Sequence, residues 1–135
     1  MMKIVSRLYL PLLGVMLATG IMVSCSGQDT VTQPQQVVFP GSSVSFGRHV
    51  LPLFDLGCTY GGCHNSADAA GDLQLTSYID LFRSPGLVRP GDSASSVLWQ
   101  IVAGRLPHSY PLVNVVNANQ VHGIAVWIQE GASNN

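Results

Sequence analysis

Hydrophobic and polar positions divide the chain into three parts. Residues 8–23 are almost continuously apolar, the stretch that follows is rich in Ser, Gln, Thr, Gly and Pro without a sustained period, and apolar residues recur at helical spacing from Ser45 onward. The pattern therefore predicts a leader over residues 1–24, a flexible linker over residues 25–44 and one small domain over residues 45–135.

Helical signals dominate the predicted domain. Four helices are expected: one that Ser45 caps and Pro52 interrupts, two shorter ones over residues 77–82 and 94–103, and a last one that Asn117 caps and Gly131 ends. Their apolar faces are Phe46, Val50, Leu53 and Phe54 in the first helix, Val97, Leu98, Ile101 and Val102 in the third, and Val121, Ile124, Ala125 and Ile128 in the last. Because strand-like alternation is confined to Leu73–Leu75, the sequence predicts an all-α fold class.

The leader has the features of a secretory signal. Lys3 and Arg7 precede the apolar run, which is shorter than the ~20 residues that span a membrane. Met22-Val23-Ser24-Cys25 resembles a bacterial lipoprotein signal, in which the cysteine is acylated and becomes the new N-terminus. An ordinary cleaved signal and an uncleaved anchor are the alternatives. We therefore expect an exported protein of the bacterial cell envelope, attached to the membrane through a lipid on Cys25.

The residue after Cys25 favours one membrane over the other. It is a serine, whereas an aspartate at this place is associated with retention in the inner membrane. The sequence thus predicts an outer-membrane lipoprotein that faces the periplasm or the cell surface.

Charge and cysteine content narrow the functional classes. Beyond Cys25 the chain has four arginines, no lysine and seven acidic residues, so it lacks the basic patch of a nucleic-acid-binding protein. Two cysteines remain, Cys58 and Cys63. In an exported protein such a pair does not remain as two free thiols: it forms a disulfide or it binds a cofactor. The pair is therefore the first candidate for chemistry.

The two cysteines belong to the stretch Cys58-Thr59-Tyr60-Gly61-Gly62-Cys63-His64. Two thiols add to the vinyl groups of a haem and an adjacent imidazole reaches its iron, so this order indicates covalent haem attachment. The usual motif has two residues between the cysteines, whereas this one has four, and its two glycines supply backbone that can adopt positive φ. The alternatives are a disulfide that closes a glycine-rich turn and a metal site with Cys58, Cys63 and His64 as ligands.

The motifs around this stretch resemble a known family. A Pro-Leu-Phe helix precedes it, and it is followed by Gly71-Asp72-Leu73-Gln74-Leu75, by Val88-Arg89-Pro90-Gly91-Asp92-Ser93 with Ser96-Val97-Leu98, and by Val126-Trp127-Ile128-Gln129-Glu130-Gly131-Ala132. Over residues 46–132 the order is similar to that of the cytochrome c domains of the planctomycete type. The resemblance implies a cytochrome c-like helical domain wrapped around one haem c, attached covalently through Cys58 and Cys63, with His64 as the proximal ligand of the iron.

The family pattern is broken at the distal ligand. A Met-Pro-Pro-like segment precedes the last helix in the family, but the matching stretch here is Arg105-Leu106-Pro107-His108, and all four methionines lie in the leader. His108, two places from the family's methionine, is the expected sixth ligand; His122, His49 and an open position are the alternatives. A thioether favours ferrous iron more than an imidazole does, so the exchange predicts a low reduction potential.

Three functions remain open on these grounds. The favoured one is a lipid-anchored electron-transfer protein that meets redox partner proteins at the membrane and is not an enzyme, since no acid–base constellation is visible. The second is a sensor or enzyme with five-coordinate haem. The third is a non-haem lipoprotein that binds partners and is stapled by a Cys58–Cys63 disulfide.

Overall fold

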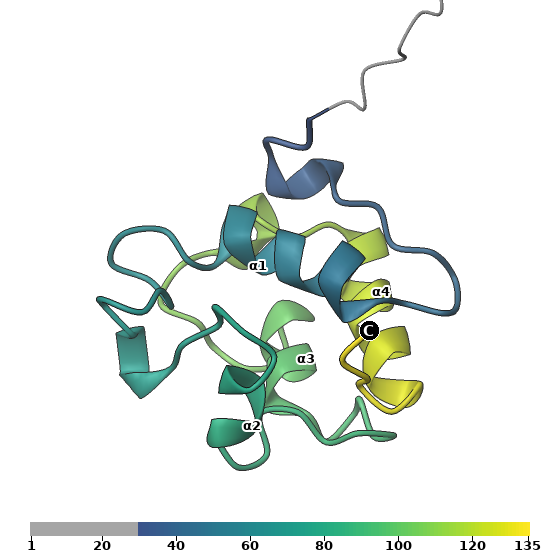
Figure 1. The fold of residues 1–135 in the computed structure, drawn as a ribbon. Helices are drawn as coiled ribbons and strands as arrows, with labels where there is room; N and C mark the ends of the chain where they lie inside the picture. Colours follow the sequence, from purple (N-terminus) through teal and green to yellow (C-terminus); the bar gives the residue numbers. More distant parts are fainter. Residues whose placement is uncertain (1–29) are drawn as a thin grey trace, which may run out of the picture.

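The computed structural model describes residues 30–135, which form helices and turns and contain no strand (Figure 1). The α-helices are α1 (Leu51–Gly57), α2 (Asp80–Arg83), α3 (Val97–Val102) and α4 (Ala118–Gln129), and shorter turns lie at η1 (Pro34–Gln36), η2 (Phe46–Val50), η3 (Ala70–Asp72) and η4 (Leu112–Asn114). The all-α prediction is confirmed for this part of the chain. The predicted signal peptide and the lipidation site at Cys25 lie outside the described residues. No helix within residues 30–135 combines the length and the hydropathy needed to cross a membrane.

The helix that leads into the cysteines is built from two joined pieces. Ser45 begins η2, because its side-chain oxygen accepts a hydrogen bond from the Arg48 N–H (3.3 Å). Pro52 has no N–H to donate, and η2 is a wider turn than an α-helix directly before α1 starts at Leu51. All four apolar residues predicted for one face are buried: Phe46, Val50, Leu53 and Phe54. The helix ends at Cys58, its C-terminal cap, and so delivers that residue to the edge of the core.

The longest helix, α4, contributes the centre of the core. Asn117 caps it as predicted: its side chain accepts from the Gln120 N–H (3.1 Å), and the Gln120 side chain accepts from the Asn117 N–H (2.9 Å). Trp127 is completely buried, with its ring 5.8 Å from that of Phe46 in η2. Gly131 follows the helix with a φ of 100°, as expected of a glycine stop. These contacts fix α4 against η2.

Residues 34–44 belong to the folded domain, which corrects the prediction of a flexible linker up to residue 44. Val37, Phe39 and Val44 are buried in the core. Side chains of α4 and its cap hold the segment: Gln120 donates to the carbonyls of Pro34 and Val37, Asn119 bonds to the N–H and carbonyl of Phe39, and Glu130 accepts from the N–H groups of Ser43 and Val44. The domain therefore begins before residue 45.

This N-terminal segment also explains why the buried face of α4 differs from the prediction. Ile124 and Ile128 are buried as expected, but Val121 and Ala125 are only partly buried, and Gln120, Gly123 and Trp127 complete the interior face. A side chain at position 123 would collide with the Phe39 ring, since an added Cβ would lie 2.2 Å from it. The N-terminal segment thus covers a side of α4 that the sequence pattern alone does not predict to be buried.

Both short helices in the middle of the chain begin later than predicted. α2 begins at Asp80 instead of residue 77, and α3 begins at Val97 instead of residue 94. In the second case the Ser96 hydroxyl accepts from the Arg89 N–H (2.8 Å) and donates to the Asp92 carbonyl (2.8 Å), which holds the preceding residues in a turn.

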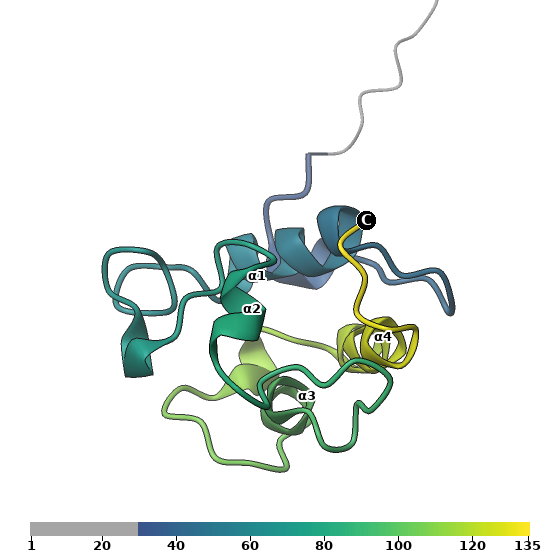
Figure 2. The same ribbon diagram turned by 60° about the horizontal axis from the view of Figure 1, so that its bottom comes forward.

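The helices surround one core, and the segment from Cys58 to η3 forms a lobe at one side of it. Figures 1 and 2 show η2 and α1 in line, α4 and the C-terminal tail beside them, and the segment from Cys58 to η3 extending beyond the end of α1. The tail returns to η2, where the Asn135 carbonyl accepts from the Ser45 hydroxyl (2.6 Å) and the Gly47 N–H (2.9 Å). Both ends of the described chain are therefore attached to the same core.

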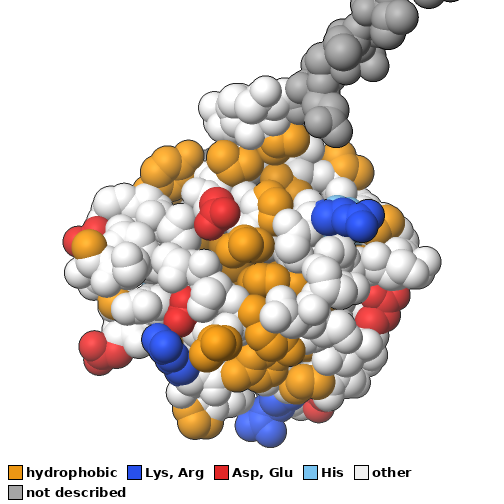
Figure 3. Space-filling model, in the orientation of Figure 1, with side chains coloured by type: hydrophobic (Ala, Val, Ile, Leu, Met, Phe, Trp, Pro, Cys, Tyr) orange, Lys and Arg blue, Asp and Glu red, His pale blue; other side chains and the backbone are white. Residues whose placement is uncertain are grey.

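Charged side chains are sparse on the surface. On the face in Figure 3, apolar side chains form a band across the middle, and charged groups lie singly around it. Large exposed apolar residues include Tyr60, Ile79, Phe82 and Tyr110. This face of the described domain has no continuous basic patch, in agreement with the low content of basic residues.

Candidate functional site

A cavity of about 810 Å³ lies between the end of α1, the segment after it, α3 and the segment before α4. Its walls are mainly apolar and include Phe54, Leu56, Leu73, Leu75, Leu87, Leu98, Ile101, Val102, Leu112 and Val115. Cys58, Cys63 and His64 also line it, together with His108. Cofactor sites are typically concave, mostly apolar and about 300–1,000 Å³ in volume. The cavity therefore has the size and lining of a cofactor site.

The two cysteines are half-buried free thiols at this cavity. The turn that contains them is closed by hydrogen bonds from the His64 N–H to the Cys58 carbonyl (3.0 Å) and from the Cys63 N–H to the Tyr60 carbonyl (2.9 Å). Burial, and then the charge of Cys63, raise the pKa of Cys58 to about 12. Cys58 is therefore a neutral thiol at neutral pH.

Two side chains that the sequence interpretation missed hold the loop between the cysteines. The Asp68 carboxylate accepts hydrogen bonds from the Gly62 N–H (2.7 Å) and from the Asn65 side-chain amide (2.7 Å), and the same amide donates to the Tyr60 carbonyl (2.9 Å). Gly62 has a φ of 81°, which glycine adopts without strain. The hydrogen bonds from Asn65 and then Gly62 lower the pKa of Asp68. Asn65 followed by Asp68, directly after the histidine, is a turn signal that sequence reasoning can use.

His64 is oriented by backbone groups of the following segment. Its Nδ1 lies 3.2 Å from the Leu73 carbonyl oxygen, and because a carbonyl only accepts, the ring proton is assigned to Nδ1. Its own carbonyl accepts from the Leu75 N–H (2.9 Å). This leaves Nε2 with a free lone pair, the arrangement common among metal-ligating histidines.

His108 reaches the same cavity from the segment between α3 and η4. Its ring centroid lies 6.0 Å from that of His64, with an angle of 57° between the ring planes. Two imidazoles on opposite sides of one metal ion have centroids about 6 Å apart, since each metal–nitrogen bond is about 2 Å and the nitrogen lies about 1 Å from the ring centre. The spacing of the two rings therefore suits a single iron between them.

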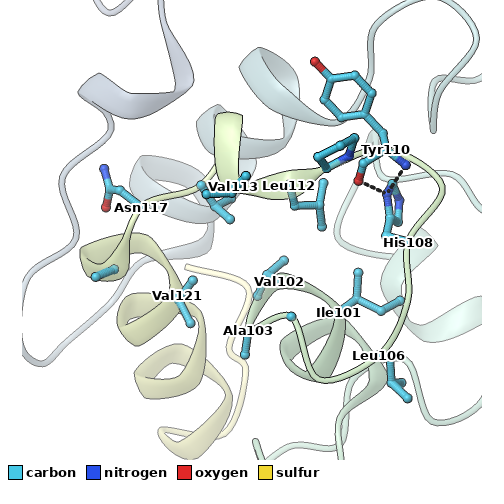
Figure 4. Close-up of a pocket in the computed structure, with 14 residues that line it drawn as sticks. Ile101, Val102, Ala103, Leu106, His108, Tyr110, Leu112, Val113, Asn117 and Val121 are labelled. Atoms are coloured by element: carbon cyan, nitrogen blue, oxygen red, sulfur yellow. Dashed lines mark hydrogen bonds between the residues drawn. The ribbon is translucent and has the colours of Figure 1, made fainter.

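The loop that carries His108 is attached to the core only at its ends. Residues 104–111 are all exposed, and Nδ1 of His108 is bonded within the loop, 2.9 Å from the carbonyl oxygen and 3.2 Å from the nitrogen of Tyr110. Figure 4 shows this interaction at the edge of a second pocket, of about 400 Å³, with the Tyr110 ring directed away from it. The same loop thus borders both cavities, and its own backbone sets the orientation of His108.

The other two histidines lie away from the cavity. His49 in η2 accepts from the Ser45 N–H with Nδ1 (3.0 Å), and its ring lies 5.8 Å from that of Phe39. His122 is exposed on α4. Neither residue lines the cavity, so His108 is the histidine that the fold brings to His64.

The chemistry of the lining residues fits a haem. Among the described residues no three His, Cys, Asp or Glu side chains are grouped closely enough to hold a metal ion, and Cys58 and Cys63 are not joined by a disulfide. Two thiols, an imidazole with a free Nε2 and apolar walls are the groups that a covalently attached haem requires. Cys58, Cys63 and His64 could hold such a group, and His108 lines the same cavity as a further candidate ligand.

One wall of the cavity comes from the N-terminal segment whose composition predicts a linker. Gln33, Pro34 and Gln35 line the cavity, and the Gln35 side chain donates to the carbonyl of Asn114, the last residue of η4. The glutamine-rich composition of this segment is typical of linkers, so the sequence contains little signal for this role.

Part of this site is similar to a known protein family. A protein-family model described as Planctomycete cytochrome C matches residues 61–109, a range that contains Cys63, His64 and His108. Neither a curated protein nor a solved structure matches the chain. The resemblance indicated by the sequence motifs is thus confirmed over residues 61–109, where the chain is similar to the planctomycete cytochrome c family.

Proposed function

We propose that the protein is an exported, lipid-anchored c-type cytochrome that carries electrons between redox partner proteins of the cell envelope. In this proposal one haem c is attached through Cys58 and Cys63, His64 is the proximal ligand and His108 the distal ligand. The observation that carries the proposal is the 6.0 Å spacing of the two histidine rings in a cavity that both cysteines line. The family match over residues 61–109 supports the same function.

The residues of the cavity have separate roles in this proposal. A bound haem supplies one-electron exchange at its iron. Cys58 and Cys63 hold the group covalently, while the Leu73 carbonyl fixes the ring of His64 so that Nε2 is presented for ligation. The apolar walls exclude water from the group and keep its surroundings at low polarity, one of the factors that set a reduction potential.

The composition of the cavity wall favours an electron carrier over an acid–base enzyme. No Asp, Glu, Lys or Arg is present among the described residues that line it. General acid–base catalysis requires a titratable group within hydrogen-bond reach of the substrate, and in this proposal the two imidazoles that line the cavity, His64 and His108, are used as ligands of the iron. Electron transfer needs neither a proton donor nor a substrate pocket.

Exchange of the distal ligand is expected to change the reduction potential. The wild type, with two histidines, should titrate at a lower potential than cytochromes with His and Met ligands, and His108→Met should raise the midpoint by more than about 0.1 V. A redox titration followed by visible absorption measures both values. His122→Met serves as the control, because His122 is exposed on α4 and does not line the cavity. An unchanged potential in His108→Met would contradict ligation by His108.

The exposed loop around His108 favours a second candidate function, a haem sensor in which His108 leaves the iron to admit a small ligand. The ring is held only within its own loop, by the backbone of Tyr110. Carbon monoxide added to the reduced protein separates the two functions. An unchanged visible spectrum supports the electron carrier, whereas formation of a carbonyl complex supports the sensor.

Replacement of Cys25 is expected to release the protein from the membrane. The wild type should incorporate a labelled fatty acid and sediment with the envelope membranes, whereas Cys25→Ser should do neither, since acylation needs the thiol. Label retained by Cys25→Ser would refute acylation at this residue. Residue 34 already belongs to the domain, and eight residues separate Cys25 from Pro34 in the sequence. This length spans no more than about 30 Å and keeps the proposed haem close to the membrane.

A further inference from the structure

We infer that Asn65 and Asp68 are positioning residues for haem attachment, which hold the loop between Cys58 and Cys63 closed so that both thiols react. The inference rests on the proposed function and names the residues that adapt this chain to its long cysteine spacing. Neither residue is part of the cysteine and histidine motif itself.

The side chains of Asn65 and Asp68 are hydrogen-bonded to each other and to the backbone on both sides of the two-glycine turn. The Asp68 carboxylate accepts from the Gly62 N–H at 2.7 Å, and the Asn65 amide donates to the Tyr60 carbonyl at 2.9 Å. The 2.7 Å hydrogen bond from Asn65 to Asp68 joins the two side chains. The Asn65 side-chain oxygen also accepts from the N–H groups of Ala67 and Asp68, each at 2.8 Å, which fixes its own turn. We call this hydrogen-bonded pair, Asn65 and Asp68, the loop clamp.

The loop has little else to hold it. Gly61 and Gly62 are exposed, and a Cβ added to either would meet no other atom within 4 Å, so no packing restrains this stretch. One backbone hydrogen bond, from the Cys63 N–H to the Tyr60 carbonyl (2.9 Å), spans the two glycines, and the N–H of Gly62 is bonded by Asp68 alone. Two adjacent glycines have more conformational freedom than any other pair of residues. The loop clamp therefore supplies the side-chain restraint on the part of the loop that lengthens the motif, in addition to that backbone hydrogen bond.

The loop clamp is also attached to the segment that carries the second cysteine. The Ala69 N–H donates to the Asn65 carbonyl (3.0 Å), and the Ala70 N–H donates to the Cys63 carbonyl (3.1 Å). A change in the loop clamp is thus transmitted to Cys63 through backbone hydrogen bonds.

The restraint matters because two cysteines must react with the same haem. In each addition a thiol S–H adds across a vinyl C=C bond: an S–C bond forms, the thiol proton moves to the terminal vinyl carbon, and no electrons are gained or lost overall. After the first addition, the second requires the remaining sulfur at a fixed distance from the first. A loop that opens leaves one thiol unattached and free.

The test compares variants of the full chain produced with the bacterial c-type maturation proteins. Asp68→Ala removes the acceptor of the loop clamp, and Asp68→Asn keeps an acceptor oxygen while removing the charge. Asn65→Asp keeps the oxygen that fixes the turn but loses the amide that donates to Tyr60 and Asp68. Asp55→Ala is the matched control, because Asp55 is an exposed carboxylate in α1 whose side chain bonds to none of these groups.

The measured quantity is the ratio of doubly to singly attached haem, obtained from the masses of tryptic peptides and from alkylation of the free thiol. Asp68→Ala and Asn65→Asp should lower this ratio about threefold or more, the effect of losing a hydrogen bond, while Asp68→Asn and Asp55→Ala stay near the wild type. A lower melting temperature with an unchanged ratio would overturn the inference and leave the proposed function standing. A wild type without covalent haem would overturn the proposed function and the inference with it.

Discussion

Replacing both Cys58 and Cys63 by alanine is expected to abolish covalent haem binding. The two residues are the only thiols that line the cavity within the described part of the chain, and a haem without a thioether bond is lost when the protein is denatured. Each single replacement should leave one thioether and a weaker signal. Haem staining of a denaturing gel measures the covalent fraction directly.

The third cysteine supplies the control for this experiment. Cys25 lies outside the described residues and is the proposed lipidation site, so Cys25→Ser should keep its covalent haem. Haem that remains on the denatured Cys58→Ala/Cys63→Ala variant would show that other residues hold it, and the site would have to be reassigned.

Truncation of Trp127 is expected to have the largest effect on stability. The side chain is completely buried, its ring lies 5.8 Å from that of Phe46, and its Nε1 donates to the Ser133 carbonyl (3.0 Å). Trp127→Ala should therefore lower the free energy of unfolding by about 3–5 kcal/mol, through lost burial and an unfilled cavity. Because small domains have only about 5–15 kcal/mol of stability, a measurable fraction of the variant should be unfolded at room temperature.

Urea denaturation of the holoprotein measures this loss. His122→Ala, on the exposed side of the same helix, is the matched control and should change the free energy of unfolding by less than about 0.5 kcal/mol. A loss below about 1 kcal/mol in Trp127→Ala would mean that the core is not centred on α4.

Features that depend on neighbours in sequence can be predicted from the chain. The cap at Asn117, the interruption at Pro52 and the stop at Gly131 each act within one helical turn, and all three occur in the structure. The late start of α3 is not predictable in this way, because the Ser96 hydroxyl is bonded to the backbone of Arg89 and Asp92 in place of capping a longer helix.

The N-terminal segment shows the limit of such reasoning. Val37 and Phe39 belong to a short apolar run with Val38, and Pro, Gly and two serines separate this run from Val44. Glutamines and Pro34 precede the run, a composition that also describes flexible linkers. The partners of this segment, Asn119, Gln120 and Glu130, are about eighty residues away in sequence, so only the tertiary structure pairs them. The polar side chains of Gln120 and Asn119 on α4 hold the N-terminal segment, a role that only these contacts reveal.

The residues of the candidate site also differ in how far the sequence predicts them. The two cysteines and His64 lie within seven consecutive residues, so the motif alone indicates them. His108 is indicated only by its place relative to a family pattern, and its approach to His64 depends on a loop conformation that no local signal specifies. Asn65 and Asp68 are easily overlooked because polar residues in a loop ordinarily need no explanation, although their spacing is that of a turn.

The measurement that tests the central claim most directly is a pyridine haemochrome spectrum of the full chain, produced with c-type maturation proteins and extracted with acidified acetone. We predict the spectrum of a haem with both vinyl groups saturated, retained by the denatured protein, and a shift toward a single-thioether spectrum in Cys58→Ala and Cys63→Ala. A well-expressed protein that contains no haem, or a haem that the solvent extracts completely, would contradict the proposal that this chain is a c-type cytochrome.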